Sequence, residues 1–238
     1  MRRLWLVALA GLASLTGCYY YGQQSADPPQ GDSTSTTAPA EPPTGQLSLM
    51  EGAVSLRAAA GDTWSIPDTN VVLGSGDRLW VDTVGHLEVE FGSTAVRLSS
   101  ETELHLVRVE SGVLQLLLPQ GSIDYRLREV DTAKTYEVDA PNAAIFLEEN
   151  GEYRIDVSSN GDTTRLVTWS GHAQVAAAGR TFPVDSGQMV YVRGDSTTGY
   201  QIQPAGPMDA FDLWARERNS REEDSGPMEE EQTDANSP

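Results

Sequence analysis

Two serines, Ser33 and Ser196, each follow a Gly-Asp pair. A serine in such a turn can act as a nucleophile when a histidine further along the chain takes its proton. The last histidine is His172, so none follows Ser196. Ser33 lies in a stretch rich in proline, serine and threonine, which could not hold the backbone donors that such a reaction needs. We therefore interpret both segments as turns, in which Gly, Asp and Ser are common.

Three glutamates, Glu88, Glu90 and Glu103, could supply acid–base chemistry. Glu88 and Glu90 are two positions apart in an alternating segment, so their side chains point the same way from one strand. A glycosidase needs two carboxylates across a cleft at a set separation, and the sequence offers no cleft aromatics beside this pair. Adjacent glutamates on one face are more typical of a solvated surface. We therefore expect no catalytic residue here.

The three histidines, His86, His105 and His172, lack the close spacing of metal ligands. His86 and His105 fall on the polar faces of expected strands, where plain surface residues are common. The chain also lacks the GxSxG, phosphate-loop, HExxH and SxxK motifs. We therefore expect a protein that is not an enzyme and that holds neither a metal ion nor a cofactor.

The single cysteine, Cys18, closes a hydrophobic N-terminal segment. Two arginines follow Met1, and the apolar run of residues 4–15 is too short to cross about 30 Å of hydrocarbon, which takes roughly 20 residues. Residues 1–17 are therefore predicted to be a secretory signal peptide cleaved between Gly17 and Cys18. The ending Leu-Thr-Gly-Cys resembles the bacterial lipobox, which implies that Cys18 carries acyl chains that anchor it in a membrane. The alternative is a plain signal peptide with an incidental cysteine.

Residues 18–45 are predicted to be a disordered tether behind the lipidated cysteine. They are rich in Pro, Ser, Thr, Gln and Gly, and they lack the apolar period that a core requires. Tyr19, not Asp, follows Cys18, and by resemblance to enterobacterial lipoproteins this favours the outer membrane over the inner one. We expect a lipid-anchored protein of the bacterial cell envelope whose folded part faces the periplasm.

The charge balance argues against a nucleic-acid partner. The 238 residues include 35 acidic and 16 basic side chains, which gives a formal net charge of −19. A nucleic-acid-binding protein needs a basic face to neutralise phosphates. The acidity also opposes direct attraction to an anionic membrane surface.

Residues 46–205 are predicted to form an all-β domain. Polar and apolar residues alternate without a break in 86–91, 123–127 and 153–157, which is typical of half-buried strands. Residues 113–118 are apolar on both faces apart from Gln115, so this strand should lie centrally. Turn residues recur every seven to twelve positions. We expect an antiparallel β-sandwich or roll of many short strands.

Three segments of this region look alike, with a glycine between two apolar runs. They centre on Gly52, Gly112 and Gly171. The likeness indicates either one repeated hairpin unit or the general similarity of hairpins in any β protein.

The C-terminal part changes character after the strands. Met208, Phe211 and Trp214 are spaced three residues apart, so residues 206–221 are predicted to form one short amphipathic helix. We expect its apolar side to pack on the β domain, and the alternative is that Phe211 and Trp214 bind a partner. Residues 222–238 are acidic, lack an apolar period and are expected to be disordered.

Several segments of the β region resemble the FecR domain, and they occur in the same order. Residues 73–79 and 85–92 are similar to its pattern G-D-x-L followed by G-x-A-x-L-x-F-x-D-G. Residues 118–123, 136–143 and 184–189 are similar to its later L-x-x-G-x-V, Y-x-V-x-T-P-x-A and V-x-x-G-Q pieces. Residues 211–218 also resemble a segment of some FecR-like lipoproteins.

This resemblance implies a periplasmic β domain used for protein–protein signalling. In the iron-uptake regulators that name the family, the domain meets an outer-membrane transporter and passes information to a cytoplasmic anti-sigma segment. The sequence shows no counterpart of that cytoplasmic segment, so direct sigma-factor control is not expected.

The leading hypothesis is a non-enzymatic interaction or signalling module that binds another envelope protein. The first alternative is a module that binds polysaccharide or peptidoglycan through Trp64, Trp80 or Trp169, although tryptophans within or beside strands are more often core residues. The second is a hydrolase with dispersed carboxylates.

Overall fold

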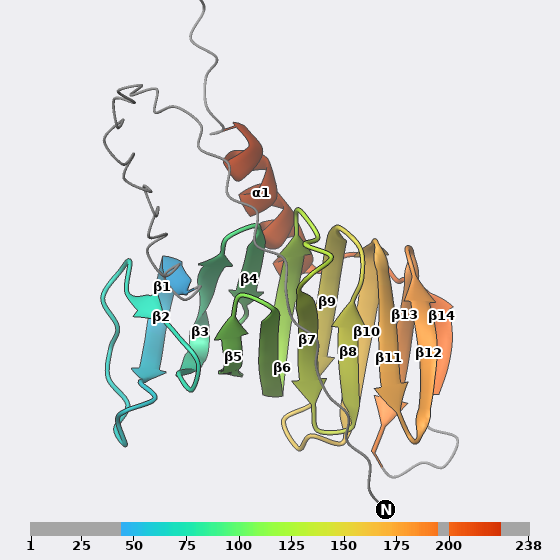
Figure 1. The fold of residues 1–238 in the computed structure, drawn as a ribbon, viewed down its shortest axis with the longest axis horizontal. Helices are drawn as coiled ribbons and strands as arrows, with labels where there is room; N and C mark the ends of the chain where they lie inside the picture. The colour runs from blue at the N-terminus through green and yellow to red at the C-terminus, as the bar shows by residue number, and fades with distance from the viewer. Residues whose placement is uncertain (1–43, 195–199, 225–238) are drawn as a thin grey trace, which may run out of the picture. The chain divides into compact units, whose positions relative to one another are not determined.

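The computed structural model describes residues 44–194 and 200–224, which form fourteen β-strands and one α-helix (Figure 1). Gly17, Cys18, Ser33 and Ser196 lie outside the described residues. The elements are β1 (Gly45–Arg57), β2 (Val72–Leu73), β3 (Arg78–Phe91), β4 (Thr94–Leu98), β5 (Thr102–Glu110), β6 (Val113–Leu127), β7 (Thr135–Ala140), β8 (Ala143–Leu147), β9 (Gly151–Val157), β10 (Thr163–Ser170), β11 (His172–Ala177), β12 (Arg180–Asp185), β13 (Gln188–Arg193), β14 (Tyr200–Pro204) and α1 (Ala210–Asp224).

The strands belong to one continuous sheet that folds into two layers, because long strands pass from one layer into the other. Residues 87–91 of β3 pair with β4, whereas residues 78–81 pair with β5. In the same way, β6 pairs with β4 through residues 123–127 and with β5 through its first half. We call the layer that contains β4 layer A and the layer that contains β5 layer B.

After β6 the chain builds both layers one hairpin at a time. The hairpin β7–β8 extends layer B and the hairpin β9–β10 extends layer A. The hairpin β11–β12 then joins β8 in layer B, and β13–β14 joins β10 in layer A (Figure 1). All of these pairs are antiparallel except β6–β7, which is parallel. The expected all-β, mainly antiparallel fold with one short helix is confirmed.

Alternating apolar side chains from both layers meet in one buried core. Leu87 and Val89 of β3 enter it from layer A, and Ile145 of β8 enters it from layer B. The apolar segment 113–118 lies between β5 and β7, as its two apolar faces predicted.

The three similar glycine segments occupy different places in the fold. Gly52 lies inside β1, at an irregularity in its pairing with β3. Gly112 lies in the tight turn between the paired strands β5 and β6, whereas Gly171 joins β10 to β11, which belong to different layers. The structure therefore decides against a repeated hairpin unit.

Gly121 allows β6 to bend between the two layers. Its φ of +97° is a conformation that other residues rarely adopt. A Cβ atom added there would lie 2.4 Å from the Cα atom of Thr102. The oxygen Oγ1 of Thr102 also accepts a hydrogen bond from the backbone N–H of Ser122, at 2.9 Å. The two strands are therefore in close contact where β6 changes layer.

The helix α1 begins at Ala210 and not at residue 206 as expected, and it continues to Asp224 in the segment that was expected to be disordered. Asp209 Oδ1 accepts hydrogen bonds from the backbone N–H groups of Phe211 and Asp212, at 2.9 and 3.0 Å. Asp212 Oδ2 accepts one in return from the backbone N–H of Asp209, at 2.9 Å. This reciprocal capping box determines where the helix starts.

Within residues 44–194 and 200–224, no helix has both the length and the hydropathy that a membrane span requires.

Candidate functional site

The outer face of layer A carries a row of alternating charges across four adjacent strands. The register places Glu88 of β3 beside Arg97 of β4, Arg97 beside Asp124 of β6, and Asp124 beside Arg154 of β9. They share a face because they occupy matching positions of neighbouring strands. We call these four residues the charged row. All four are buried, with Glu88 only 1% exposed and Arg97 0% exposed.

Arg97 is bonded by both the sheet and the helix. Its Nε donates to Glu88 Oε2 at 2.6 Å, and its Nη1 donates to Asp124 Oδ1 at 3.2 Å. Its Nη1 also donates to Asn219 Oδ1 at 2.7 Å, and its Nη2 donates to Glu222 Oε1 at 2.8 Å. The guanidinium group therefore joins β3, β4, β6 and α1 in one hydrogen-bonded network.

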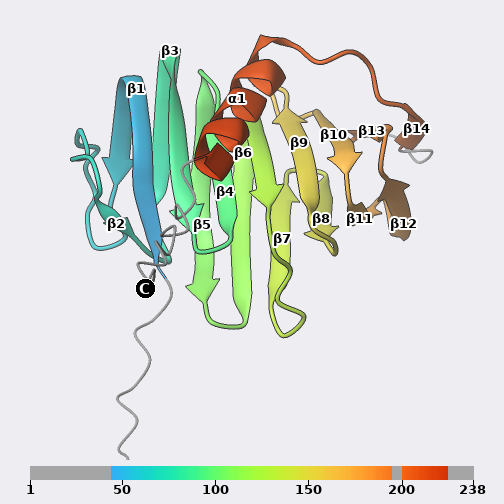
Figure 2. The same ribbon diagram turned by 90° about the horizontal axis from the view of Figure 1, so that it is seen from above.

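The helix α1 covers the charged row (Figure 2). Arg218 donates to both carboxylate oxygens of Glu88, at 2.6 and 3.2 Å. At the other end of the row, Arg154 Nη1 donates to Asp212 Oδ1 at 3.1 Å, so the helix cap is tied to β9. Paired donors on a carboxylate make a geometrically specific contact. The helix is therefore held in a defined position along the sheet.

Phe211 and Trp214, the two residues considered for partner binding, both contact the sheet. Phe211 is buried, and the centroid of its ring lies 4.5 Å from the guanidinium carbon of Arg154. Trp214 is partly buried and stacks on His86, with ring centroids 4.3 Å apart. His86 Nδ1 also lies 3.4 Å from Glu51 Oε2. Packing of the helix on the β domain is thus observed, and partner binding by Phe211 and Trp214 stays a prediction.

The charged row contains carboxyl groups with opposite pKa shifts. Burial raises the pKa of Glu88, but hydrogen bonds from Arg218 and Arg97 outweigh this effect and hold the pKa at about 2. Burial raises the pKa of Asp124 to about 6, because the nearby charge of Arg97 offsets burial only in part. Glu88 therefore stays ionised at any physiological pH, whereas Asp124 titrates close to neutrality.

The interpretation of Glu88 and Glu90 as a solvated pair is wrong. They do point the same way, but α1 covers Glu88, and Glu90 accepts hydrogen bonds from Arg128 at 3.0 and 3.2 Å. Oxygens of Glu88, Glu90 and Glu222 lie within 4.8 Å of one another, a spacing that could suit a cation. Each of the three already accepts a hydrogen bond from an arginine. Guanidinium groups therefore supply the positive charge in this cluster.

Glu103, the third candidate carboxylate, lies elsewhere. It belongs to β5 in layer B, where its Oε1 is 2.6 Å from His105 Nε2. The structure therefore does not bring Glu103 together with Glu88 and Glu90.

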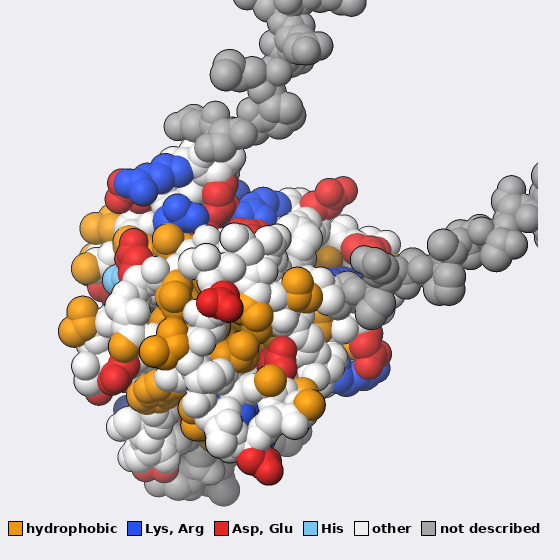
Figure 3. Space-filling view, turned by 90° about the vertical axis from the view of Figure 1, so that its left-hand side faces the viewer, with side chains coloured by type: hydrophobic (Ala, Val, Ile, Leu, Met, Phe, Trp, Pro, Cys, Tyr) orange, Lys and Arg blue, Asp and Glu red, His pale blue; other side chains and the backbone are white. Residues whose placement is uncertain are grey.

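A second feature is an apolar surface at the β1 end of the sheet, which we call the end face. The segment 58–73 runs along the outer edge of β1, with backbone hydrogen bonds to Leu47 and Leu56. It exposes Trp64 (44%), Ile66 (83%) and Val72 (64%). Figure 3 shows apolar side chains gathered over this end of the molecule, with acidic side chains among them. Trp64 and Ile66 flank Ser65, which bridges Leu56 near the end of β1, whereas Val72 pairs with Gln46 near its start. Exposed large apolar side chains along one edge are candidates for an interaction site.

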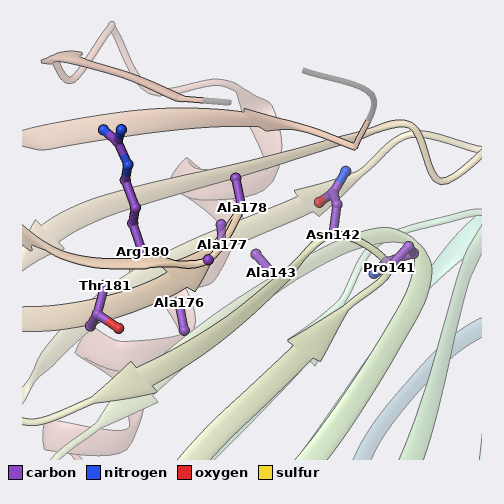
Figure 4. Close-up of a pocket in the computed structure, with 9 residues that line it drawn as sticks. Pro141, Asn142, Ala143, Ala176, Ala177, Ala178, Arg180 and Thr181 are labelled. Carbon is purple, nitrogen blue, oxygen red and sulfur yellow. The ribbon is translucent and has the colours of Figure 1, made fainter. Parts of the chain in front are cut away.

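The described surface carries a hollow beside the turns β7–β8 and β11–β12. It has a volume of about 470 Å³ and is lined by residues from β8, β11 and β12 and the turns beside them, four of them alanines, with Arg180 and Asn142 at its two ends (Figure 4). The amide of Asn142 is already bonded to Thr164 Oγ1 and to the carbonyl of Asp162. A small-molecule site needs several polar groups that converge on the ligand, so this hollow does not meet that requirement.

The three tryptophans considered for sugar binding stand on separate elements. Trp64 lies in the segment between β1 and β2, Trp80 in β3 and Trp169 in β10. Only Trp64 is exposed by more than a third of its surface. Among the described residues, none of the three stacks on another aromatic ring.

The sequence did not identify Arg97, Asp124 and Arg154 as site residues. The alternation of polar and apolar residues along their strands indicates that these three side chains point away from the core, but it does not show that α1 covers them. One available signal was the order of charges at outward positions, namely acidic on β3, basic on β4, acidic on β6 and basic on β9. That signal requires the strand pairing, which the sequence alone did not supply.

Comparison with known proteins finds similarity only to solved structures, and only over part of the chain. No family model matches the chain, and no curated protein matches it. Two crystal structures of a candidate anti-sigma factor from Parabacteroides distasonis are similar, each with a TM-score of 0.47, at 13% and 15% sequence identity. The similarity covers 53% of this chain and 59% of those chains, so it spans less than two thirds of their length.

Proposed function

We propose that this protein is a non-enzymatic, FecR-like module of the bacterial envelope that binds another envelope protein. The end face carries this proposal, because Trp64 and Ile66 are exposed on either side of Ser65, and Val72 is exposed further along the same edge of β1. Surfaces of this kind are removed from water when a protein partner binds. The FecR-like sequence segments support the assignment to a signalling module.

The lipobox-like ending at Cys18 supports a membrane anchor. In the proposed arrangement, acyl chains on Cys18 hold the protein at the outer membrane, and the tether leaves the β domain free in the periplasm. Because β1 begins at Gly45 and Gln46 pairs with Val72, the Val72 end of the end face lies beside the point where the tether joins the β domain. A partner at the membrane surface would be within reach of this face.

Site-specific photo-crosslinking in the producing cells tests the proposal. A photoreactive residue at Ile66 should yield one discrete protein adduct, and Trp64→Asp should abolish that adduct. The same residue placed at Val107, which is exposed on β5, is the matched control and should give no such adduct.

The second candidate, binding of cell-wall polysaccharide, is favoured only by the exposure of Trp64. Retention of the purified protein on isolated cell wall, lost in Trp64→Asp and with no protein adduct at Ile66, would support it. That result would overturn the proposal of a protein partner.

A further inference from the structure

The contact between α1 and layer A is more polar than the contact between permanently packed elements usually is. Among residues 210–222 of the helix, the buried ones are Phe211, Asp212, Ala215 and Asn219, and two of these four are polar. On the sheet side, the helix contacts buried charged residues of the row. A polar interface is characteristic of surfaces that associate and separate, whereas permanent interfaces are more apolar.

The charged row remains charge-balanced without the helix. Arg97 donates to Glu88 and Asp124 within the sheet, and Arg154 Nε donates to Asp156 Oδ1 at 2.7 Å. If α1 left, water would solvate a face of alternating charges and would meet little apolar surface. Exposure of this face therefore costs less than exposure of an apolar sheet face of the same area.

The connectivity also allows the helix to leave. The chain reaches α1 from β14 through residues 205–209, in which Gly206 and Pro207 are exposed. No described strand follows α1. Displacement of the helix would therefore not require any strand pair to break.

The contacts of α1 define what this face recognises. Asp212 meets Arg154, Arg218 meets Glu88, and Asn219 and Glu222 both meet Arg97. Counted from Asp212, these positions are 0, 6, 7 and 10, which fall on one side of a helix with 3.6 residues per turn. Ala215 lies on the same side and is buried, so the helix can approach the sheet closely.

We propose that the face beneath α1 is a helix-binding surface, which α1 occupies within its own chain and which a helix of another protein can occupy in its place. That helix would present a carboxylate, then an arginine–asparagine pair, then a second carboxylate, at the spacing found in α1. The proposal goes beyond the binding site at the end face and does not depend on it.

A labelled peptide with the sequence of residues 206–224 is the probe, and the purified full chain is the receptor. Arg218→Ala removes the contact of α1 with Glu88 but leaves Arg97 bonded to Glu88. The peptide should bind this variant at least tenfold more tightly than it binds the wild-type chain, because the internal helix competes less well. A peptide carrying Arg218→Glu and Asn219→Ala should bind neither chain.

Ser220→Ala is the matched control, because Ser220 is exposed on α1 and its Oγ donates to the backbone carbonyl of Arg216 in the same helix, at 3.2 Å. This variant should bind the peptide as the wild-type chain does. Ile66→Asp should also leave peptide binding unchanged, which separates this proposal from the proposed function.

Hydrogen exchange followed by mass spectrometry supplies the second measurement. The amides of α1 should exchange well before those of β6 in the wild-type chain, and earlier still in Arg218→Ala, while β6 stays protected. Exchange of α1 only together with β6, and no saturable peptide binding, would overturn the proposal. Early exchange of α1 without peptide binding would overturn it as well, because α1 would then fray without exposing a binding surface.

Discussion

Arg97 links layer A to α1 because its guanidinium group has five N–H donors and no single carboxylate can accept them all. The sheet supplies Glu88 and Asp124 as acceptors, and the helix supplies Asn219 and Glu222. If Arg97 were removed, the buried Asp124 and Asn219 would lose this donor, whereas Glu88 would keep Arg218 and Glu222 would keep Arg128. The stability of the network therefore depends on this side chain more than on any one of its partners.

Arg97→Ala is expected to lower the free energy of unfolding by about 3–5 kcal/mol, because loss of one partner leaves uncompensated buried charges. Urea denaturation of both proteins measures the change. Arg108→Ala is the matched control, because Arg108 forms an exposed pair with Glu110 on β5 and should change stability little. Equal effects of the two substitutions would contradict the role given to the charged row.

Cys18→Ala is expected to move the protein from the membrane fraction to the soluble fraction of the envelope. The reason is that the proposed acyl chains on this residue supply the stable attachment. Immunoblotting of fractionated cells measures the distribution. A variant that still sediments with membranes would show that lipidation at Cys18 is not the anchor.

At the level of elements, the bend in β6 decides how the two layers are connected. Its first half pairs with β5 and β7, and its second half pairs with β4 and β9. Gly121 lies at the change, with a positive φ and with Thr102 in close contact. A larger residue would therefore disturb both layers at once.

Gly121→Ala should destabilise the protein clearly more than Gly92→Ala does. Both glycines have a positive φ, which costs other residues roughly 1–2 kcal/mol. A Cβ atom at Gly121 would also collide with Thr102, whereas one at Gly92 would meet nothing within 4 Å. We expect the collision to add about 1–3 kcal/mol, measured as a difference between thermal or urea unfolding curves. Indistinguishable curves for the two variants would mean that β6 does not need Gly121 for its bend.

The side of α1 that packs on the sheet differs from the apolar face that the sequence predicted. The spacing of Met208, Phe211 and Trp214 predicted an apolar face, but the side that is buried runs along Phe211, Ala215 and Asn219. The sheet beneath it is charged, so polar residues of the helix face inward. Leu213 is instead 59% exposed.

At the scale of the whole molecule, acidic side chains outnumber basic ones, 35 to 16. Several of the arginines are collected around the charged row, where they pair with Glu88, Glu90, Asp124 and Glu222. The response of the fold to pH therefore depends on a few buried carboxyl groups more than on the net charge.

Stability should follow pH in two opposite steps. The pKa of Glu88 is about 2 in the fold against 4.5 for the free side chain, so its contribution is complete above pH 4.5 and is lost as the pH falls towards 2. The pKa of Asp124 is about 6 against 3.8, so protonation of Asp124 stabilises the fold as the pH falls from 6 towards 4. Urea unfolding at a series of pH values measures both steps.

Two substitutions separate these contributions. Asp124→Asn should flatten the curve between pH 4 and 6, and Glu88→Gln should flatten it between pH 2 and 4.5. A wild-type stability that falls steadily from pH 7 downward would contradict the assignment to these two groups.

Local patterns in the sequence predicted much of the fold. The alternation in residues 86–91 placed Leu87 and Val89 inward and Glu88 outward, because an extended chain turns successive side chains to opposite faces. The apolar character of both faces of residues 113–118 placed that strand at the centre, between β5 and β7. It did not predict the charged row, because an outward position leads to solvent only when no other element covers it.

The sequence by itself determined the all-β character, the C-terminal helix and the lipobox-like motif at Cys18, since each depends on neighbours within a few residues. Only the tertiary structure decided which strands pair, how the hairpins alternate between the layers, and that α1 covers Glu88 and Arg97. The physical reason is distance along the chain. Glu88 and Arg218 are 130 residues apart, and their contact exists only after the two layers have formed and the helix has returned over layer A.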